Sequence, residues 1–281
     1  MRLFQLLSST VVTGLMSLVL TGQTFAAAQL SIATEGYLRP YNFTRPDGTL
    51  DGYEIELGKY LCQHMKVECT FVAQPFDGLI TGLNAGKFDV IMAGLTATAA
   101  REQIIDFSTS YSLTPQVFAT LKGGRYQNLP QTNQTLFLSQ DPSIAKNTVK
   151  EVRAALAGAI VGVTKGTVDD ALVQAYFRDA FTVREYRSGE EGLLDLMSGR
   201  IDAVVNSRAF LSATAKIPGY EKLALTGPFY LGSVLGRGVG VGIRKSDTQL
   251  LKDFNEAIDS AKADGTIKRL SMKWFGFDVT P

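Results

Sequence analysis

Two stretches of this 281-residue chain repeat one pattern of a helix, a glycine turn and a buried strand. Residues 80–94 read ITGLNAGKFDVIMAG, and residues 193–207 read LLDLMSGRIDAVVNS. The alignment pairs Asp89 with Asp202 at the start of each strand, and Gly94 falls opposite Ser207. Two copies of one unit predict two α/β lobes of similar construction that face each other across a cleft. Clefts between domains are preferred sites for small ligands.

Polar residues follow the strand of the first copy. Residues 76–83 carry apolar side chains at the i, i+3, i+4, i+7 spacing of a helix with one buried face. Residues 88–93 form a nearly all-apolar run, typical of a strand in a parallel sheet. Gly94, Thr96 and Arg101 come directly afterwards, where open α/β sheets bind ligands. They predict a small-anion site, with a solvated surface arginine as the alternative.

The amino terminus has the form of a secretory signal peptide. Arg2 gives it a positive start, residues 11–20 are apolar, and residues 26–28 are small alanines at a cleavage site. We therefore expect residues 1–28 to be removed. The alternative is an uncleaved anchor, but the apolar run is short for a spanning helix. No later stretch is long and apolar enough to cross a membrane.

The balance of basic and acidic residues in the expected mature chain disfavours two classes of partner. Arg2 is the only charged residue in the signal peptide, so 27 basic and 27 acidic residues remain. This balance disfavours binding to nucleic acids and electrostatic attachment to membranes.

Two cysteines, Cys62 and Cys69, lie seven positions apart. In an exported protein an even number of cysteines predicts a disulfide. The alternative is a metal site formed by both cysteines and His64, which offers only three ligands. His64 is the only histidine, so catalysis by Ser-His-Asp or Cys-His groups is excluded.

Two further loops follow predicted strands. Residues 30–34 form the first strand, and Glu35 with Tyr37 just beyond it could line a site for a cation. Residues 159–163 form another strand, which leads through Lys165 into a helix near residue 170. Backbone N–H groups at such a turn favour anions. Residues 117–121 and 227–236 are interpreted as the two crossings between lobes, and residues 238–243 as a strand.

The chain resembles the periplasmic solute-binding proteins for polar amino acids, which are the receptors of ABC importers. The resemblance covers nearly all of residues 29–281. Its motifs are ATEG at 33–36, GYEIELGKYLC at 52–62, FDGLITGLNAGKFDVIMAGLTATAAR at 76–101, VGVTKGT at 161–167 and DGTIKRLSMKWFG at 264–276. The cysteine pair and ATEG are similar to the branch that binds lysine, arginine and ornithine or octopine and nopaline.

This resemblance implies an α/β fold of two lobes, the type II or Venus-flytrap architecture, with two hinge crossings. We expect lobe 1 to comprise residues 29–113 plus 233–281, and lobe 2 to comprise residues 114–232. Closure on a ligand that contacts both lobes would be a hinge movement. No cofactor or metal is implied, and nothing in the sequence demands more than a monomer.

The resemblance also implies how an amino-acid head group is held. Arg101 matches the arginine that pairs with the ligand α-carboxylate in two hydrogen bonds. Thr96 and the backbone carbonyl of Gly94 match groups that bind the carboxylate or the amine. Thr167 and the N–H of Val168 match the second-lobe contacts with the carboxylate.

The side-chain end of the ligand has its own expected contacts. Phe76 matches an aromatic wall, and Glu35 matches the acid that meets a distal cationic group. Leu38 stands where relatives carry a second aromatic wall, and the adjacent Tyr37 is its expected substitute. The complete expected ligand set is Glu35, Tyr37, Leu38, Phe76, Ala93, Gly94, Thr96, Arg101, Thr164, Lys165, Thr167, Val168, Asn206 and Ser207.

Ser207 occupies the position where many amino-acid receptors carry an aspartate for the α-ammonium group. Serine there would tolerate the additional carboxylate of an opine, because like charges in contact cost several kcal/mol. We therefore expect an arginine-derived opine or a cationic amino acid as ligand, and an inner-membrane ABC permease as partner. The alternatives are a periplasmic enzyme similar to cyclohexadienyl or arogenate dehydratases, and a ligand-sensing partner of a membrane receptor.

Overall fold

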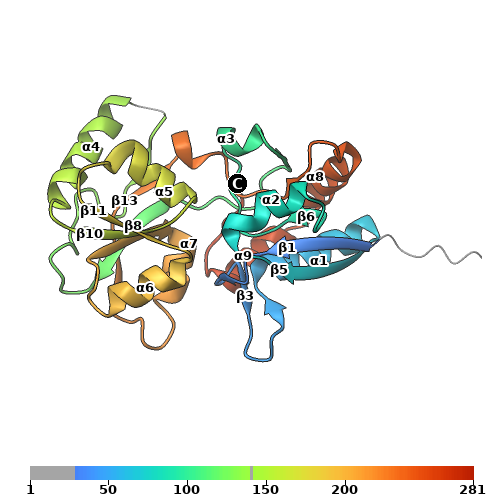
Figure 1. The fold of residues 1–281 in the computed structure, drawn as a ribbon, viewed down its shortest axis with the longest axis horizontal. Helices are drawn as coiled ribbons and strands as arrows, with labels where there is room; N and C mark the ends of the chain where they lie inside the picture. Colours follow the sequence, from blue (N-terminus) through green and yellow to red (C-terminus); the bar gives the residue numbers. More distant parts are fainter. Residues whose placement is uncertain (1–28, 140–141) are drawn as a thin grey trace, which may run out of the picture.

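The computed structural model describes residues 29–139 and 142–281, and the expected signal peptide lies outside this range. Two α/β bodies stand side by side, each built around its own sheet (Figure 1). No helix in the described part of the chain combines the length and the hydropathy that a membrane span requires.

The first sheet contains the amino-terminal strands and one strand from near the carboxyl terminus. In spatial order its strands are β5 (Glu68–Ala73), β1 (Gln29–Thr34), β6 (Val90–Ile91), β14 (Gly242–Ile243) and β7 (Asp106–Phe107). The strands β5, β1 and β6 are parallel, and β14 runs antiparallel to both of its neighbours. A small separate sheet comprises β2 (Tyr37–Leu38), β3 (Asn42–Thr44) and β4 (Leu50–Asp51).

Helices cover both faces of the first sheet. The helices α1 (Tyr53–Met65), α8 (Thr248–Ala263) and α9 (Thr266–Trp274) pack together on the face that carries Ile32 and Val90. The helix α2 (Leu79–Asn84), preceded by the 3-10 turn η1 (Phe76–Gly78), packs on the opposite face with Ala33 and Ile91. The carboxyl-terminal helices thus share one hydrophobic core with α1.

The second sheet has the spatial order β11 (Thr182–Tyr186), β10 (Ile160–Thr164), β12 (Ala203–Ser207), β8 (Gln116–Leu121), β13 (Leu223–Leu231) and β9 (Thr135–Phe137). One face is covered by α4 (Pro142–Ala155), α5 (Val168–Leu172) and the π-helix η2 (Val173–Phe177). The other face is covered by α6 (Gly189–Met197) and α7 (Arg208–Thr214). Each body is therefore a three-layer α/β sandwich, as the repeat predicts.

The two copies of the repeat adopt the same local structure. Gly86 and Gly199 end their helices in the left-handed region, at φ of 71° and 72°, where glycine carries no Cβ penalty. Asp89 then accepts a hydrogen bond from the N–H of Ser31 at 2.8 Å, and Asp202 accepts one from the N–H of Ile160 at 2.8 Å. In both bodies the aspartate thus ties its own strand to the start of the neighbouring strand.

Several expected elements differ from the structure. Residues 117–121 are not a crossing but lie in β8, which is hydrogen-bonded on both sides inside the second sheet. Most of the expected return crossing at 227–236 belongs to β13 and the 3-10 turn η3 (Ser233–Leu235). The expected strands at 88–93 and 238–243 are shorter in the structure, where they are reduced to β6 and β14.

We propose that the chain changes lobe between β7 and β8 and again between β13 and β14, because no strand of either sheet lies in those intervals. The two segments run alongside each other. The N–H of Val239 donates to Ser112 O at 2.7 Å, and the N–H of Tyr111 donates to Val239 O at 2.9 Å. Paired crossings of this kind can bend together as one hinge.

Cys62 and Cys69 form the expected disulfide, which joins α1 to β5. Because both thiols are used in this bond, the alternative metal site with His64 is excluded.

Candidate functional site

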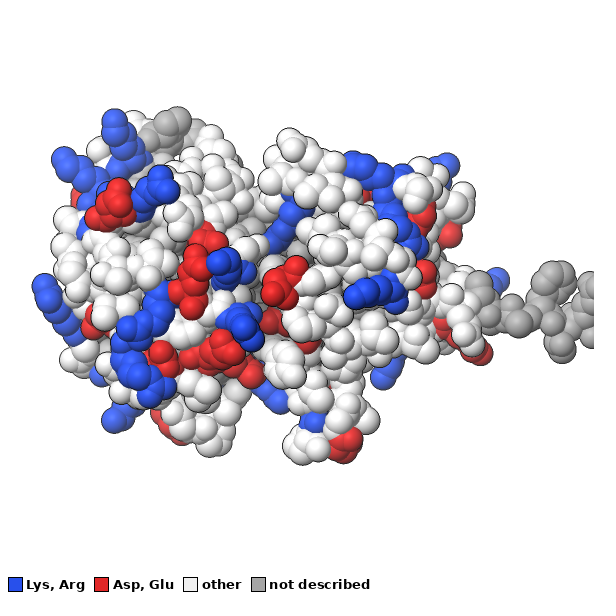
Figure 2. Space-filling model, in the orientation of Figure 1, with Lys and Arg blue, Asp and Glu red and all other residues white. Residues whose placement is uncertain are grey.

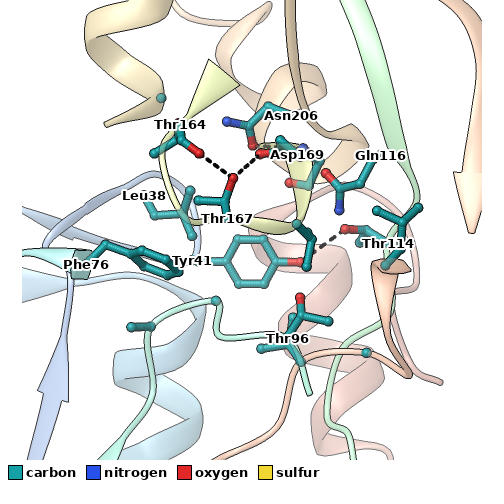
Figure 3. A pocket seen from close by; sticks show the side chains of 18 of the residues that line it. Leu38, Tyr41, Phe76, Thr96, Thr114, Gln116, Thr164, Thr167, Asp169 and Asn206 are labelled. Carbon is teal, nitrogen blue, oxygen red and sulfur yellow. Dashed lines mark hydrogen bonds between the residues drawn. The ribbon is translucent and has the colours of Figure 1, made fainter. Parts of the chain in front are cut away.

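A cavity lies between the two lobes and has about 790 Å³ of space, its opening to solvent included. Twelve of the fourteen expected ligand residues line it, namely Glu35, Leu38, Phe76, Ala93, Gly94, Thr96, Arg101, Thr164, Thr167, Val168, Asn206 and Ser207. Figure 3 shows side chains from both lobes converging on this space.

Arg101 reaches across the cleft from the short helix α3 (Ala99–Glu102). Thr98 caps this helix by accepting from the N–H of Arg101 at 3.3 Å. The guanidinium donates from Nη1 to Thr96 O at 2.9 Å and from Nη2 to Gly166 O at 3.0 Å. The first bond fixes the side chain within lobe 1, and the second joins it to lobe 2.

Burial lowers the pKa of Arg101 to about 10, and the nearby charge of Asp169 opposes this effect. The guanidinium lies 5.5 Å from the ring centroid of Phe76, within the range of a cation–π contact. It takes part in none of the ion pairs among the described residues. A ligand carboxylate would give Arg101 the ion-pair partner that it lacks among the described residues.

Glu35 lies just past the end of β1 and is 7% exposed. Its pKa is raised to about 8, first by burial and then by the negative charges of Glu54 and Glu190. Within residues 29–139 and 142–281 its carboxylate forms no hydrogen bond or ion pair. A cation at this end of the cavity would relieve both the burial and the repulsion.

The backbone on the lobe 1 side is held by a buried carboxylate. Glu54 of α1 accepts from the N–H of Gly94 at 2.7 Å and from the hydroxyl of Tyr111. It also accepts from Asn42 Nδ2, and Asn42 Oδ1 accepts from the N–H of Gly36 at 2.7 Å. One network therefore fixes the strand ends that carry Glu35 and Gly94.

The lobe 2 wall follows β10. The hydroxyl of Thr167 faces two acceptors, Thr164 O at 2.7 Å and Asp169 Oδ2 at 3.3 Å (Figure 3). Because the hydroxyl has one hydrogen, the shorter contact takes most of its donor strength.

Asp169 is a site residue that the sequence interpretation missed. It is 4% exposed, lines the cavity, and its Oδ1 has no hydrogen-bond partner. Burial raises its pKa to about 7; the hydroxyl of Thr167 opposes this, Asp170 adds to it, and Arg101 opposes it. The sequence signal for this residue was the pair Asp169-Asp170 at the start of a helix. Consecutive helical residues face different sides, so one of the two acids could face the cleft.

Ser207 lies at the end of β12 and caps α7. Its Oγ accepts from the N–H of Phe210 at 3.2 Å, and its own N–H donates to Asn206 Oδ1 at 2.8 Å. The aspartate expected of many receptors at this position is absent, but Asp169 places an acid in the same cavity from another element.

Two expected ligand residues lie outside this cavity. Tyr37 is 54% exposed, and Lys165 pairs with Glu185 at 3.0 Å. Both line an adjacent hollow at the mouth of the cleft, where charges of both signs gather (Figure 2). Tyr37 lies outside the cavity because side chains alternate along a strand. In β2 its neighbour Leu38 faces inward, so Tyr37 faces outward.

Tyr41 provides the second aromatic wall in place of Tyr37. It is buried, lines the cavity, and its hydroxyl lies 3.0 Å from Ser112 Oγ in the first crossing. Thr114 and Gln116 also line the cavity and were missed, because residues around 117 were interpreted as a plain connection.

The chain is similar to known proteins over most of its length. Residues 30–277 match the model of the bacterial extracellular solute-binding proteins, family 3. The octopine-binding periplasmic protein of Rhizobium meliloti is 40% identical over 94% of this chain and 96% of its own length. The L-arginine-binding protein of Pseudomonas aeruginosa is 34% identical, over 93% of each chain. The structure of an ancestral arginine-binding protein bound to arginine superposes with a TM-score of 0.74 at 29% identity, covering 89% of this chain and 100% of that one.

Proposed function

Because the chain belongs to the bacterial extracellular solute-binding proteins of family 3, we propose that it binds an arginine-derived opine or a cationic amino acid for an ABC importer. Its place of action would be the periplasm, and its partner the permease of that importer. The relatives are named as octopine- and arginine-binding proteins, which supports binding over catalysis.

One observation carries the choice of ligand class. The cavity places a half-buried cation, Arg101, and a buried, unpaired acid, Glu35, among its lining residues. A ligand with a carboxylate at one end and a guanidinium or ammonium at the other would neutralise both. Phe76 and Tyr41 supply apolar surface for the carbon chain between the two charges. A neutral amino acid would leave Glu35 without a counter-charge.

The Arg101–Gly166 hydrogen bond indicates how binding is coupled to closure. Arg101 belongs to lobe 1 and Gly166 to lobe 2, so the guanidinium approaches the second lobe only when the cleft is closed. A carboxylate bound by Arg101 would also meet the backbone around Thr167 and Val168. The ligand would therefore stabilise the closed form by contacting both lobes.

A thermal-shift screen tests the proposal. The ligands are octopine, nopaline, arginine, lysine, ornithine and histidine, with glutamine as a matched neutral control. At about 100 times its dissociation constant a ligand adds about 2.7 kcal/mol, which is about 5–10 °C for a protein of this size. We expect a shift with at least one cationic ligand and none with glutamine.

The pattern of shifts decides between the two ligand classes. A shift with the opines alone would support the argument from Ser207 that a second carboxylate is accommodated. A shift with arginine or lysine alone would identify a cationic amino-acid receptor. No shift with any cationic ligand would reject the proposed function.

A further inference from the structure

We propose that Asp169 binds the amine of the ligand, as the carboxylate partner of the ammonium group whose own carboxylate is held by Arg101. This inference rests on the proposed function and specifies its chemistry. The ligand would carry a basic primary or secondary amine next to its carboxylate.

The state of the Asp169 side chain is the first argument. A buried carboxylate normally has several hydrogen-bond donors, because burying a charge without them is costly. Asp169 is 4% exposed, yet its Oδ1 has no partner, and Oδ2 has only the 3.3 Å contact with a hydroxyl that is engaged elsewhere. A buried acceptor on the wall of a ligand cavity is suited to a donor that arrives with the ligand.

The position of Asp169 is the second argument. It belongs to the first turn of α5 in lobe 2, whereas Arg101 reaches into the cavity from lobe 1. Arg101 donates to the carbonyl of Gly166, three residues before Asp169, and both side chains line the same cavity, so one small zwitterion could contact both. Its carboxylate would contact the cation, and its ammonium the acid.

An ammonium group has three donors, and the cavity offers acceptors from both lobes. The carbonyl of Gly94 is the expected acceptor on the lobe 1 side, and the N–H of Gly94 is already held by Glu54. Asp169 would be the acceptor on the lobe 2 side. The amine would then join the two lobes as the carboxylate does, so both halves of the zwitterion favour closure.

The other polar side chains of lobe 2 that line the cavity are neutral. Ser207 is engaged in capping α7, and Asn206 donates or accepts without charge. A secondary or primary ammonium needs a negative partner when it is taken out of water. Among the lobe 2 residues that line the cavity, Asp169 is the only acid.

A purely structural role is the alternative, since acids in a first helical turn stabilise a helix. The adjacent Asp170 is better placed for that role. It accepts from the N–H of Gly166 at 3.2 Å and from Gln174 Nε2 at 3.4 Å, and it does not line the cavity. Asp170→Asn is therefore the matched control, because it removes one carboxylate charge from the same turn.

The experiment measures dissociation constants by titration calorimetry at pH 8.5. The ligands are arginine, octopine and argininic acid, which replaces the amine of arginine by a hydroxyl and keeps its carboxylate and guanidinium. We expect Asp169→Asn to weaken arginine or octopine at least tenfold, the range for losing a buried charged partner. Argininic acid should bind this variant as well as it binds the wild type, and Asp170→Asn should change every constant less than about twofold.

A second variant separates a lost charge from a damaged fold. Asp169→Asn combined with Ser207→Asp returns a carboxylate to the cavity at a position where aspartate can still cap α7. Arginine should regain most of its affinity in this double variant, whereas octopine should not, because an aspartate at position 207 would repel its additional carboxylate.

Three outcomes bear on the inference. Equal loss of arginine and argininic acid in Asp169→Asn, or no loss of either, would overturn it while the proposed function stands. Failure of the double variant to regain affinity for arginine would also contradict a role that depends on charge. If the wild type binds arginine and octopine no better than glutamine, the proposed function itself fails, and this inference fails with it.

Discussion

Arg101 is held in place by its own neighbours before any ligand is considered. Its guanidinium is bonded to Thr96 O and Gly166 O and lies over the ring of Phe76. None of these contacts is an ion pair, and together they restrict the motion of the side chain, so little conformational entropy would be lost on binding a carboxylate.

Arg101→Ala should therefore weaken ligand binding by about 2–5 kcal/mol, the range for truncating one partner of a buried charge pair. Arg101→Lys should recover only part of this loss, because lysine cannot form the paired hydrogen bonds of a guanidinium. The exposed Arg178→Ala is the control and should leave the dissociation constant unchanged. Calorimetric titration with the ligand from the thermal screen gives all three values, and tight binding by Arg101→Ala would reject Arg101 as the anchor.

At the residue scale, sequence motifs predicted most of the cavity lining but not which way each side chain faces. Tyr37 and Tyr41 are both aromatic and close in sequence, yet only Tyr41 turns inward. Asp169 and Asp170 are adjacent acids, and only Asp169 is buried in the cavity. Such choices depend on the local backbone direction, and one residue reverses the face of a strand.

Among the elements, the repeated aspartate explains why helix, turn and strand recur together. Asp89 and Asp202 bind a backbone N–H of the neighbouring strand at the same distance of 2.8 Å. The strands they join, β1 with β6 and β10 with β12, are the strands whose ends carry cavity residues. The aspartates therefore join these strands near their amino-terminal ends, opposite to the ends that carry the cavity residues.

Asp202→Ala should lower the free energy of unfolding by about 1–3 kcal/mol, because the N–H of Ile160 loses its acceptor. Asp202→Asn keeps an acceptor oxygen and should lose less. The exposed Asp259→Ala on α8 is the control, with a change within about 0.5 kcal/mol. Denaturant unfolding of the three variants measures these differences. A stability of Asp202→Ala equal to that of the control would mean that the hydrogen bond is not a structural tie.

Helices with a clear apolar period were predicted well, and short strands were not. The helix expected at 76–83 matches η1 and α2, whereas the apolar run at 117–121 was assigned to a crossing. A run of five apolar residues has no period that distinguishes a central strand from a buried connection. Its place in the second sheet is decided by antiparallel pairing with β12 and β13, which are distant in sequence.

At the scale of the whole molecule, closure of the cleft buries two acids from opposite lobes. Glu35 comes from lobe 1 and Asp169 from lobe 2, and burial is the largest cause of the raised pKa of each. Opening the cleft would expose both to water and bring each pKa back towards its ordinary value. The sequence could indicate two lobes and a hinge. It could not indicate these pKa changes, because they depend on burial between the lobes, which no local pattern encodes.

The unliganded protein should therefore open as pH rises. The closed form, in which the pKa of Glu35 is about 8 and that of Asp169 about 7, binds protons more tightly than an open form with ordinary values. Proton binding thus favours closure at low pH, and this advantage is lost as pH rises through those values, by up to about 1.4 kcal/mol per pH unit for each group. Glu54, Glu190 and Asp170 add to the raised values, and Arg101 opposes the shift of Asp169.

Small-angle X-ray scattering at pH 5.5 and pH 8.5 measures this effect as a change in the radius of gyration. We expect the unliganded wild type to be larger at pH 8.5, and saturating ligand to return it to the compact value, because the ligand amine and guanidinium would neutralise the ionised acids. The variant that combines Glu35→Gln with Asp169→Asn has no carboxylate to ionise in the cavity, so its radius should not depend on pH. The Asp170→Asn variant keeps both buried acids and should expand as the wild type does. Expansion of the double variant with pH would contradict the argument, because groups outside the cavity would then control the cleft.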